Sequence, residues 1–196
     1  MRPIPFILCL AAASVLAAPG IAQAHMTPPV VYLSDRDAVV GMTAGAKKHF
    51  VREVKLTPEE QRAIASQSGW QADEPFYRFY LGRGEDGKIV SAVTFLTEFT
   101  IHGPMRVAVA LGPDGKVKDA RIIEVTEEIS TWVKPLAAGG FLQQFVGRDS
   151  RGSFAVPASH AASQENMVHF YGEVTARLIH RGAILFDTAF LKRGEM

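Results

Sequence analysis

The chain has 196 residues, of which 47% are hydrophobic and 21% are charged. This composition excludes a disordered chain, because it supplies enough apolar side chains to build a core. Twenty-one basic residues against 20 acidic ones leave a formal net charge of +1, which argues against a nucleic-acid-binding protein. The single cysteine, Cys9, excludes an intrachain disulfide and a cysteine metal cluster.

Residues 1–24 have the pattern of a secretory signal peptide. Arg2 precedes an apolar stretch from Phe6 to Ala18, and Ala22-Gln23-Ala24 closes the segment as a cleavage site of the A-x-A type. The apolar stretch is shorter than the ~20 residues of a membrane-spanning helix. We therefore expect cleavage after Ala24, export to the periplasm and a mature chain without a transmembrane segment.

The mature chain, residues 25–196, is expected to form a single domain that begins with an extended arm and two helices. Ser34 or Asp35 is a candidate cap for a short helix that ends near Ala46. A second helix is expected from about residue 57 to Ser68. Its start combines a capping threonine, a proline at the first helical position and the glutamate of a capping box.

The middle of the chain carries strand patterns joined by short turn signals. Asp86-Gly87 and Pro113-Asp114-Gly115 are the turn sequences. One strand, 50–56, is expected before the second helix, and four more are expected after it, at 76–81, 88–99, 105–111 and 117–125. Because short turns and not helices separate these four, neighbouring strands among them should be antiparallel.

Helical patterns return near the C-terminus. Residues 141–147 fit a short helix ended by Gly147, residues 148–162 have the composition of a surface loop, and a long helix is expected from Glu165 to about Ile184. Strands in the middle with helices at both ends predict the α+β class, an antiparallel sheet flanked by helices.

The usual local motifs of catalysis do not occur in the sequence. There is no phosphate-binding P-loop, no G-x-G-x-x-G and no G-x-S-x-G nucleophile elbow. The six histidines are dispersed, and no two of them form H-x-x-x-H. These absences argue against a hydrolase or a metalloprotease.

His25 becomes the first residue of the mature chain if cleavage follows Ala24. A free α-amine together with its own imidazole can chelate a metal ion, and imidazole suits copper. One alternative is therefore a periplasmic metal-binding protein that uses His25. The simpler interpretation is that His25 is only the residue that cleavage leaves first.

A longer pattern covers the segment from His102 to Gly147. It comprises His102-Gly103-Pro104, the turn Asp114-Gly115-Lys116, a strand that ends in Glu127-Glu128, and Phe141-Leu142-Gln143-Gln144-Phe145-Val146-Gly147. In order and spacing this set resembles the FMN-binding domain family, which includes periplasmic flavin-carrying subunits of the Rnf and sodium-pumping quinone reductase complexes. The resemblance covers about Lys88–Leu185, so it implies an FMN-binding-domain-like fold with its core at residues 88–187.

The resemblance implies that FMN binds near several particular residues. Those it points to are His102, Gly103, Glu127, Glu128, Trp132, Lys134, Gly172 and Thr175. Glycine permits a close approach of the backbone, tryptophan can stack on the isoalloxazine ring and lysine can meet a charge. The phosphate would suit the start of the last long helix.

Each of these residues also has a purely structural interpretation. Trp132 can be a core or rim aromatic, His102 a loop histidine, Glu127-Glu128 a solvated strand end and Lys134-Pro135 a turn. Thr175 can be an ordinary helix residue.

Covalent members of the family carry S-G-A-T-x-S/T, in which the threonine takes FMN through a phosphoester. Here Tyr171-Gly172-Glu173-Val174-Thr175 matches only at Gly172, and the acceptor position falls on Val174. Thr175, one residue further, is rotated by ~100° about a helix axis. We therefore expect FMN to be held non-covalently.

The leading hypothesis is an exported FMN-binding protein that carries electrons between membrane or periplasmic redox proteins. The flavin would do the chemistry, so no catalytic acid or base is required of the protein. Two other functions stay open: the metal-binding protein that uses His25, and a flavin-free interaction module of the same fold.

Overall fold

The computed structural model describes residues 28–156 and 165–194, and within them it shows an α+β protein built on one open six-stranded sheet. The strands are β1 (Pro29–Val31), β2 (Lys48–Val54), β3 (Tyr77–Arg83), β4 (Ile89–Thr100), β5 (Gly103–Leu111) and β6 (Val117–Thr126). Their order is β1-β6-β5-β4-β3-β2, and every neighbouring pair is antiparallel. The predictions of an α+β class and of antiparallel strands are therefore confirmed.

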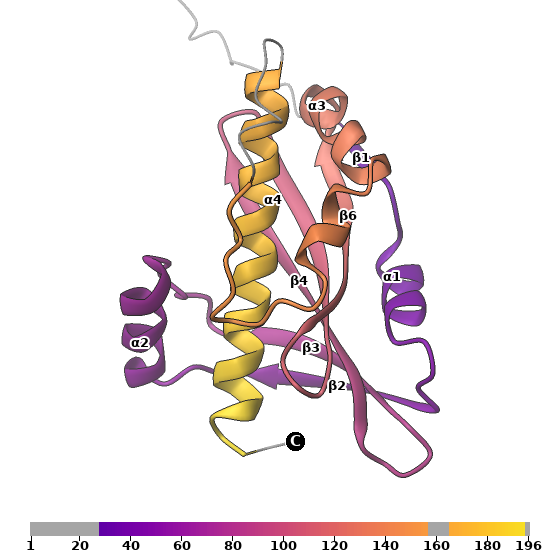
Figure 1. The fold of residues 1–196 in the computed structure, drawn as a ribbon, viewed down its shortest axis with the longest axis vertical. Helices are drawn as coiled ribbons and strands as arrows, with labels where there is room; N and C mark the ends of the chain where they lie inside the picture. The colour runs from indigo at the N-terminus through magenta and orange to yellow at the C-terminus, as the bar shows by residue number, and fades with distance from the viewer. Residues whose placement is uncertain (1–27, 157–164, 195–196) are drawn as a thin grey trace, which may run out of the picture.

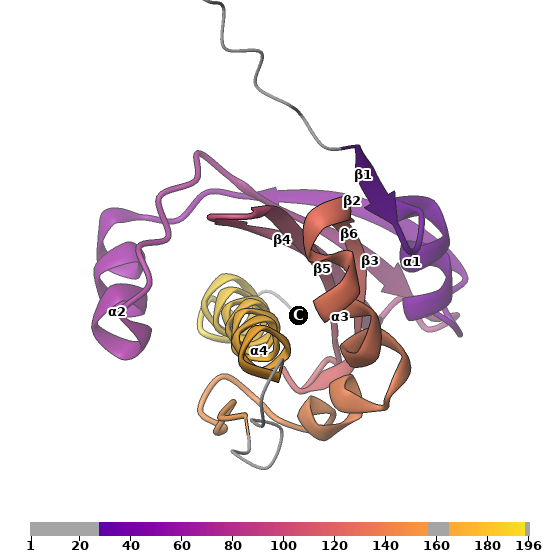
Figure 2. The same ribbon diagram turned by 90° about the horizontal axis from the view of Figure 1, so that it is seen from above.

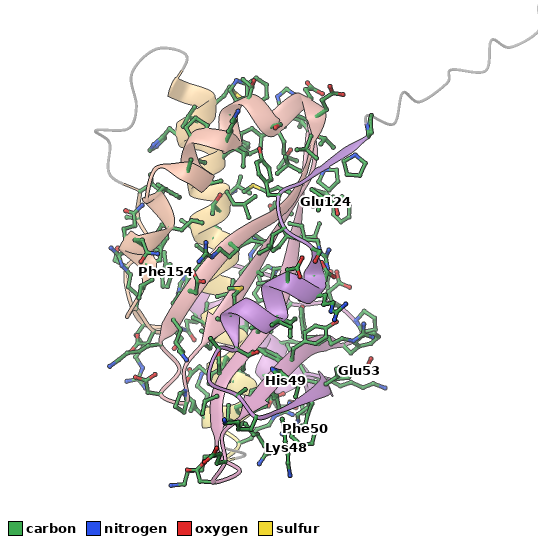
Figure 3. All side chains as sticks on the ribbon, turned by 90° about the vertical axis from the view of Figure 1, so that its right-hand side faces the viewer. Lys48, His49, Phe50, Glu53, Glu124 and Phe154 are labelled. Carbon is green, nitrogen blue, oxygen red and sulfur yellow. The ribbon has the colours of Figure 1, made fainter. Side chains whose placement is uncertain are left out.

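The helices lie on both faces of this sheet. They are α1 (Asp35–Met42), α2 (Pro58–Ser68), α3 (Glu127–Ala138), the 3₁₀ turn η1 (Phe141–Phe145), α4 (Glu165–Phe186) and the π-helical turn η3 (Asp187–Leu191). Figure 1 shows α4 running along the sheet, and Figure 2 shows the sheet curving around it. In Figure 3, α1 lies on the opposite face.

The main core lies between α4 and the sheet. Helix α4 buries Val174, Leu178 and Ile179 against the strands, and η1 adds Phe141 and Phe145. The other face holds a smaller apolar cluster, in which Ala38 and Met42 of α1 pack with side chains of β4, β5 and β6. Because β5 is covered on both faces, its residues Val107–Leu111 form a continuous apolar run in the sequence.

Helix α2 begins and ends where the sequence predicts. The Thr57 hydroxyl accepts a hydrogen bond from the Glu60 N–H, and the Glu60 carboxylate accepts one from the Thr57 N–H, which completes the capping box. Gly69 ends the helix with φ +70°, a left-handed conformation that glycine adopts without a steric cost.

The presence of helix α3 shows that two interpretations of the sequence were wrong. Glu127 and Glu128 are not a strand end but the first turn of a helix, and Lys134-Pro135 is not a turn but lies inside it. The helix forms because Ile129, Val133 and Leu136, at helical spacing, are buried against the core. Their burial outweighs the one backbone hydrogen bond that proline cannot donate.

Helix α1 ends earlier than predicted, at Met42 and not near Ala46, because the chain turns back through Gly45 at φ +91°. The expected signal peptide, residues 1–24, and the candidate metal ligand His25 lie outside the described residues. Within the described part of the chain, no helix has both the length and the apolar character needed to cross a bilayer.

Candidate functional site

The turn between β4 and β5 and the start of α3 bring three of the predicted residues together. His102 lies in the turn, and its Nδ1 is 2.7 Å from Oε1 of Glu128 in the first turn of α3. The His102 ring lies 5.4 Å from the Trp132 ring, measured between centroids. His102, Glu128 and Trp132 therefore form one contact group.

Gly103 and Thr126 hold this turn against α3. Thr126 caps the helix with extended backbone, and its hydroxyl donates a 2.8 Å hydrogen bond to the carbonyl of His102. Gly103 has φ +112°, and a Cβ there would lie 2.4 Å from Cγ2 of Thr126. The sequence predicts that another group approaches the Gly103 backbone closely. In the structure that group is Thr126 at the start of α3.

Two aromatic residues of α4 extend the group. Tyr171 stacks on Trp132 with 5.8 Å between ring centroids and 8° between ring planes, and Phe170 meets Tyr171 edge-on at 5.1 Å. The Tyr171 hydroxyl lies 3.2 Å from the Thr100 hydroxyl. Burial raises the pKa of Tyr171, so the phenol keeps its proton at neutral pH. We call His102, Glu128, Trp132, Phe170 and Tyr171 the His102 cluster.

The surface around the His102 cluster is unusually apolar. Ile101 is 91% exposed and Phe99 82% exposed, and both lie at the tip of the β4–β5 hairpin next to His102. Phe170 adds a third exposed apolar side chain. Large apolar side chains left in water in one patch are typical of a surface that binds a ligand or a partner.

The acid Glu127 and the cation Lys134 are exposed on α3. Neither side chain has a hydrogen bond or ion pair with another residue in the described part of the chain. They are seven positions apart, so they lie about two turns apart along the same face of the helix.

Gly172 and Thr175 are not part of this surface. Thr175 is fully buried, and its hydroxyl donates a 2.6 Å hydrogen bond to the Tyr171 carbonyl, 3.8 Å from the sulfur of Met105 on the other side. Gly172 faces the Phe141 ring and Val156. Attachment of a flavin to Thr175 would therefore require this part of α4 to leave the core.

Four aromatic or hydroxyl residues of the site were missed by sequence reasoning. They are Thr100, Thr126, Phe170 and Tyr171. Phe170 and Tyr171 follow the helical spacing of α4 and therefore look like core residues, and Tyr171 is indeed buried. No local pattern indicates that Tyr171 meets Trp132 from another helix.

Four pockets among the described residues are lined by other side chains. One of them, of about 370 Å³, opens beside β3 and β4 and contains Trp70, Tyr77, Phe95 and Phe99. No group of three or more histidine, aspartate or glutamate side chains in the described ranges could hold a metal ion.

Comparison with known proteins gives no assignment. No model of a known protein family matches the chain, and no curated protein matches it.

Proposed function

We propose that this protein is an exported electron-transfer protein that holds FMN non-covalently at the His102 cluster. The observation that carries the proposal is the juxtaposition of His102, Glu128 and Trp132, three of the residues that the resemblance points to, beside an uncovered apolar hairpin tip.

The residues of the cluster suit a flat, largely apolar ring with a polar edge. Trp132 and Phe170 offer aromatic surface, and Ile101 offers apolar surface that a ring would remove from water. Glu128 fixes His102 through Nδ1, which leaves Nε2 without a hydrogen bond to another described residue. That nitrogen can therefore meet a polar atom at the ring edge.

The stacked pair restricts where the ring can lie. Trp132 and Tyr171 fill the space between α3 and α4, so the ring would cover the outer side of the cluster and not enter between the helices. Glu127 and Glu128 disfavour a phosphate at the start of α3, and Lys134, the one cation of that helix, lies about 200° around the helix axis from Trp132. We therefore orient the phosphate away from α3, toward solvent.

Bound FMN would supply one- and two-electron chemistry. The chain's own part is to hold the ring edge through His102, to exclude water with Ile101 and Phe170, and to leave the hairpin tip open to a redox partner. Membrane or periplasmic redox proteins are the partners that the proposal implies.

The two tryptophans give a direct test. In the Trp70→Phe variant the remaining fluorescence comes from Trp132, and a flavin stacked nearby should quench it saturably as FMN is added. His102→Ala should weaken binding by about tenfold, the loss expected for one strong polar contact. His49→Ala on the distant strand β2 is the matched control and should bind normally.

The titration has two results that contradict the proposal. One is a folded protein whose Trp132 fluorescence does not respond to FMN, which would favour the flavin-free interaction module. The other is binding that His102→Ala and His49→Ala affect equally, which would move the flavin elsewhere.

A further inference from the structure

A pocket of about 370 Å³ opens where β3 stops short of β4. β4 pairs with β5 as far as Thr100, but its register with β3 ends at the pair Phe79–Thr94. The chain between α2 and β3 turns away at this point, so the outer half of β4 has a strand on one side only. Figure 1 shows β4 continuing past β3 alongside α4. The pocket occupies the gap in the sheet.

The walls of this gap are aromatic on both faces of the sheet. On the α4 face, Trp70 and Tyr77 meet edge-on at 5.9 Å. On the α1 face, Tyr80 and Phe95 do the same at 5.6 Å. The exposed ring of Phe99 stands on the open side. A ligand in the gap would thus have ring surfaces on either side of it.

Three arginines line the same pocket, and each is held in two ways. Each guanidinium lies over a ring: Arg78 over Phe76, Arg106 over Phe95 and Arg181 over Trp70, at 5.5, 4.8 and 5.2 Å from the ring centroids. Each is also paired with a carboxylate, which is Glu53, Asp35 and Glu98 in the same order. The positive charges are therefore compensated, while N–H groups that these pairs do not use stay available to an acceptor.

The remaining charges of the lining are negative. Asp73 and Glu74 are exposed and have no ion pair within the described part of the chain. Tyr77 accepts a hydrogen bond from the Glu74 N–H at 3.4 Å, and burial raises its pKa to about 12, so its hydroxyl keeps a proton. An anion would be repelled, whereas an uncharged group with acceptor oxygens would find donors.

We propose that this pocket binds an uncharged planar aromatic ring that bears carbonyl oxygens, the chemistry that quinones share with the isoalloxazine ring. The rings of the walls stack on such a ligand, and the arginine N–H groups meet its carbonyl oxygens. A volume of 370 Å³ lies within the ~300–1,000 Å³ usual for small-molecule sites.

This pocket is separate from the His102 cluster but adjoins it along β4. Phe99 lines the pocket, and the next residue, Thr100, touches Tyr171 of the cluster. The proposal goes beyond FMN binding at the cluster and does not depend on it.

The test uses the Trp132→Phe variant, whose remaining tryptophan, Trp70, lines the pocket. Menadione represents the quinones, and riboflavin represents the flavin ring without its phosphate. We expect saturable quenching of Trp70 by one or both. Thr97→Arg, which places a long side chain in the gap, should weaken binding more than about tenfold. The matched control Thr131→Arg, on α3, should not change it.

The two ligands distinguish a quinone site from a flavin site. Quenching by menadione alone assigns a quinone, and quenching by riboflavin alone assigns a flavin. Absence of saturable quenching by both, or equal affinity in the Thr97→Arg and Thr131→Arg proteins, overturns the proposal.

Circular dichroism establishes that each variant is folded. If Thr97→Arg unfolds the protein, Phe99→Ala at an 82% exposed position replaces it and should weaken binding severalfold. FMN titration of the Trp70→Phe variant with and without His102→Ala tests the His102 cluster separately. A flavin in the pocket would also quench Trp132, but its affinity would respond to Thr97→Arg and not to His102→Ala.

Discussion

At the scale of single residues, the most constrained position of the candidate site is Gly103. Its φ of +112° is strained for any residue with a Cβ, and the added atom would lie 2.4 Å from Thr126. We expect Gly103→Ala to destabilise the protein by about 1–3 kcal/mol, measured by urea unfolding.

Gly41 provides the matched glycine. It lies in α1 with ordinary helical backbone, and no atom from another described part of the chain lies within 4 Å of the position that a Cβ would take. Gly41→Ala should therefore stabilise the protein by about 0.5–1 kcal/mol. Equal effects of the two substitutions would contradict the strain assigned to Gly103.

Local contacts were the part of the structure that the sequence could predict. The capping box of Thr57 and Glu60 joins residues three apart, and the sequence predicts it correctly. The contact of His102 with Glu128 joins residues 26 apart. Both residues were predicted to lie near a flavin, but only from the resemblance of the whole segment to a known family. The stacking of Trp132 on Tyr171 depends on how two helices pack, which no local pattern records.

At the scale of elements, the packing of α4 on β5 depends on Gly182. A Cβ at this position would lie 3.0 to 3.2 Å from three carbons of Val109. We expect Gly182→Ala to cost about 1–3 kcal/mol, because the extra methyl group overpacks the seam between helix and strand.

A double-mutant cycle tests that cause. Val109→Ala removes the two methyl groups at 3.1 and 3.2 Å from the new Cβ and leaves only Cβ of residue 109 at 3.0 Å, so in its presence Gly182→Ala should cost less. Strictly additive effects in urea unfolding would mean that the contact between α4 and β5 is not the source of the loss.

The elements that could not be predicted are those in which tertiary packing overrides a local signal. Pro135 and the acidic pair Glu127-Glu128 favour a turn after a strand, yet burial of Ile129 and Val133 makes the segment a helix. By contrast, β3 to β6 combine long β-prone runs with Gly-containing turns, so local and global preferences agree.

At the scale of the whole molecule, an ion pair joins α2 to the C-terminal end. Arg193 contacts both carboxylate oxygens of Glu60, at 2.8 and 2.6 Å. Its hydrogen bonds lower the pKa of Glu60 below the usual value, and the Thr57 backbone adds to this effect. A lowered pKa in the folded state stabilises the fold above the ordinary glutamate pKa.

The stability that Glu60 contributes should therefore be lost as pH falls. We expect wild type and Glu60→Gln to differ in their free energy of unfolding at pH 6, and to approach each other as pH falls from about 5 toward 3. Glu59→Gln is the matched control, because its ion pair with Arg62 is exposed and should contribute little to stability. A difference that does not change with pH would contradict the role given to the Glu60 charge.

The fold class and strand direction followed from the order of elements along the chain, because short turns impose antiparallel pairing. The function does not follow in this way, since a site is made of side chains that only the complete fold brings together. The hairpin tip, α3 and α4 meet at the His102 cluster from three separate parts of the chain.

Native mass spectrometry of the purified protein, compared with the same sample after denaturation, tests the central claim most directly. The account predicts a species heavier by one FMN under native conditions, present on purification or formed on addition of FMN, and the bare chain after denaturation. A native protein that stays bare in excess FMN, or a flavin mass that survives denaturation, would contradict a non-covalent flavin at the His102 cluster.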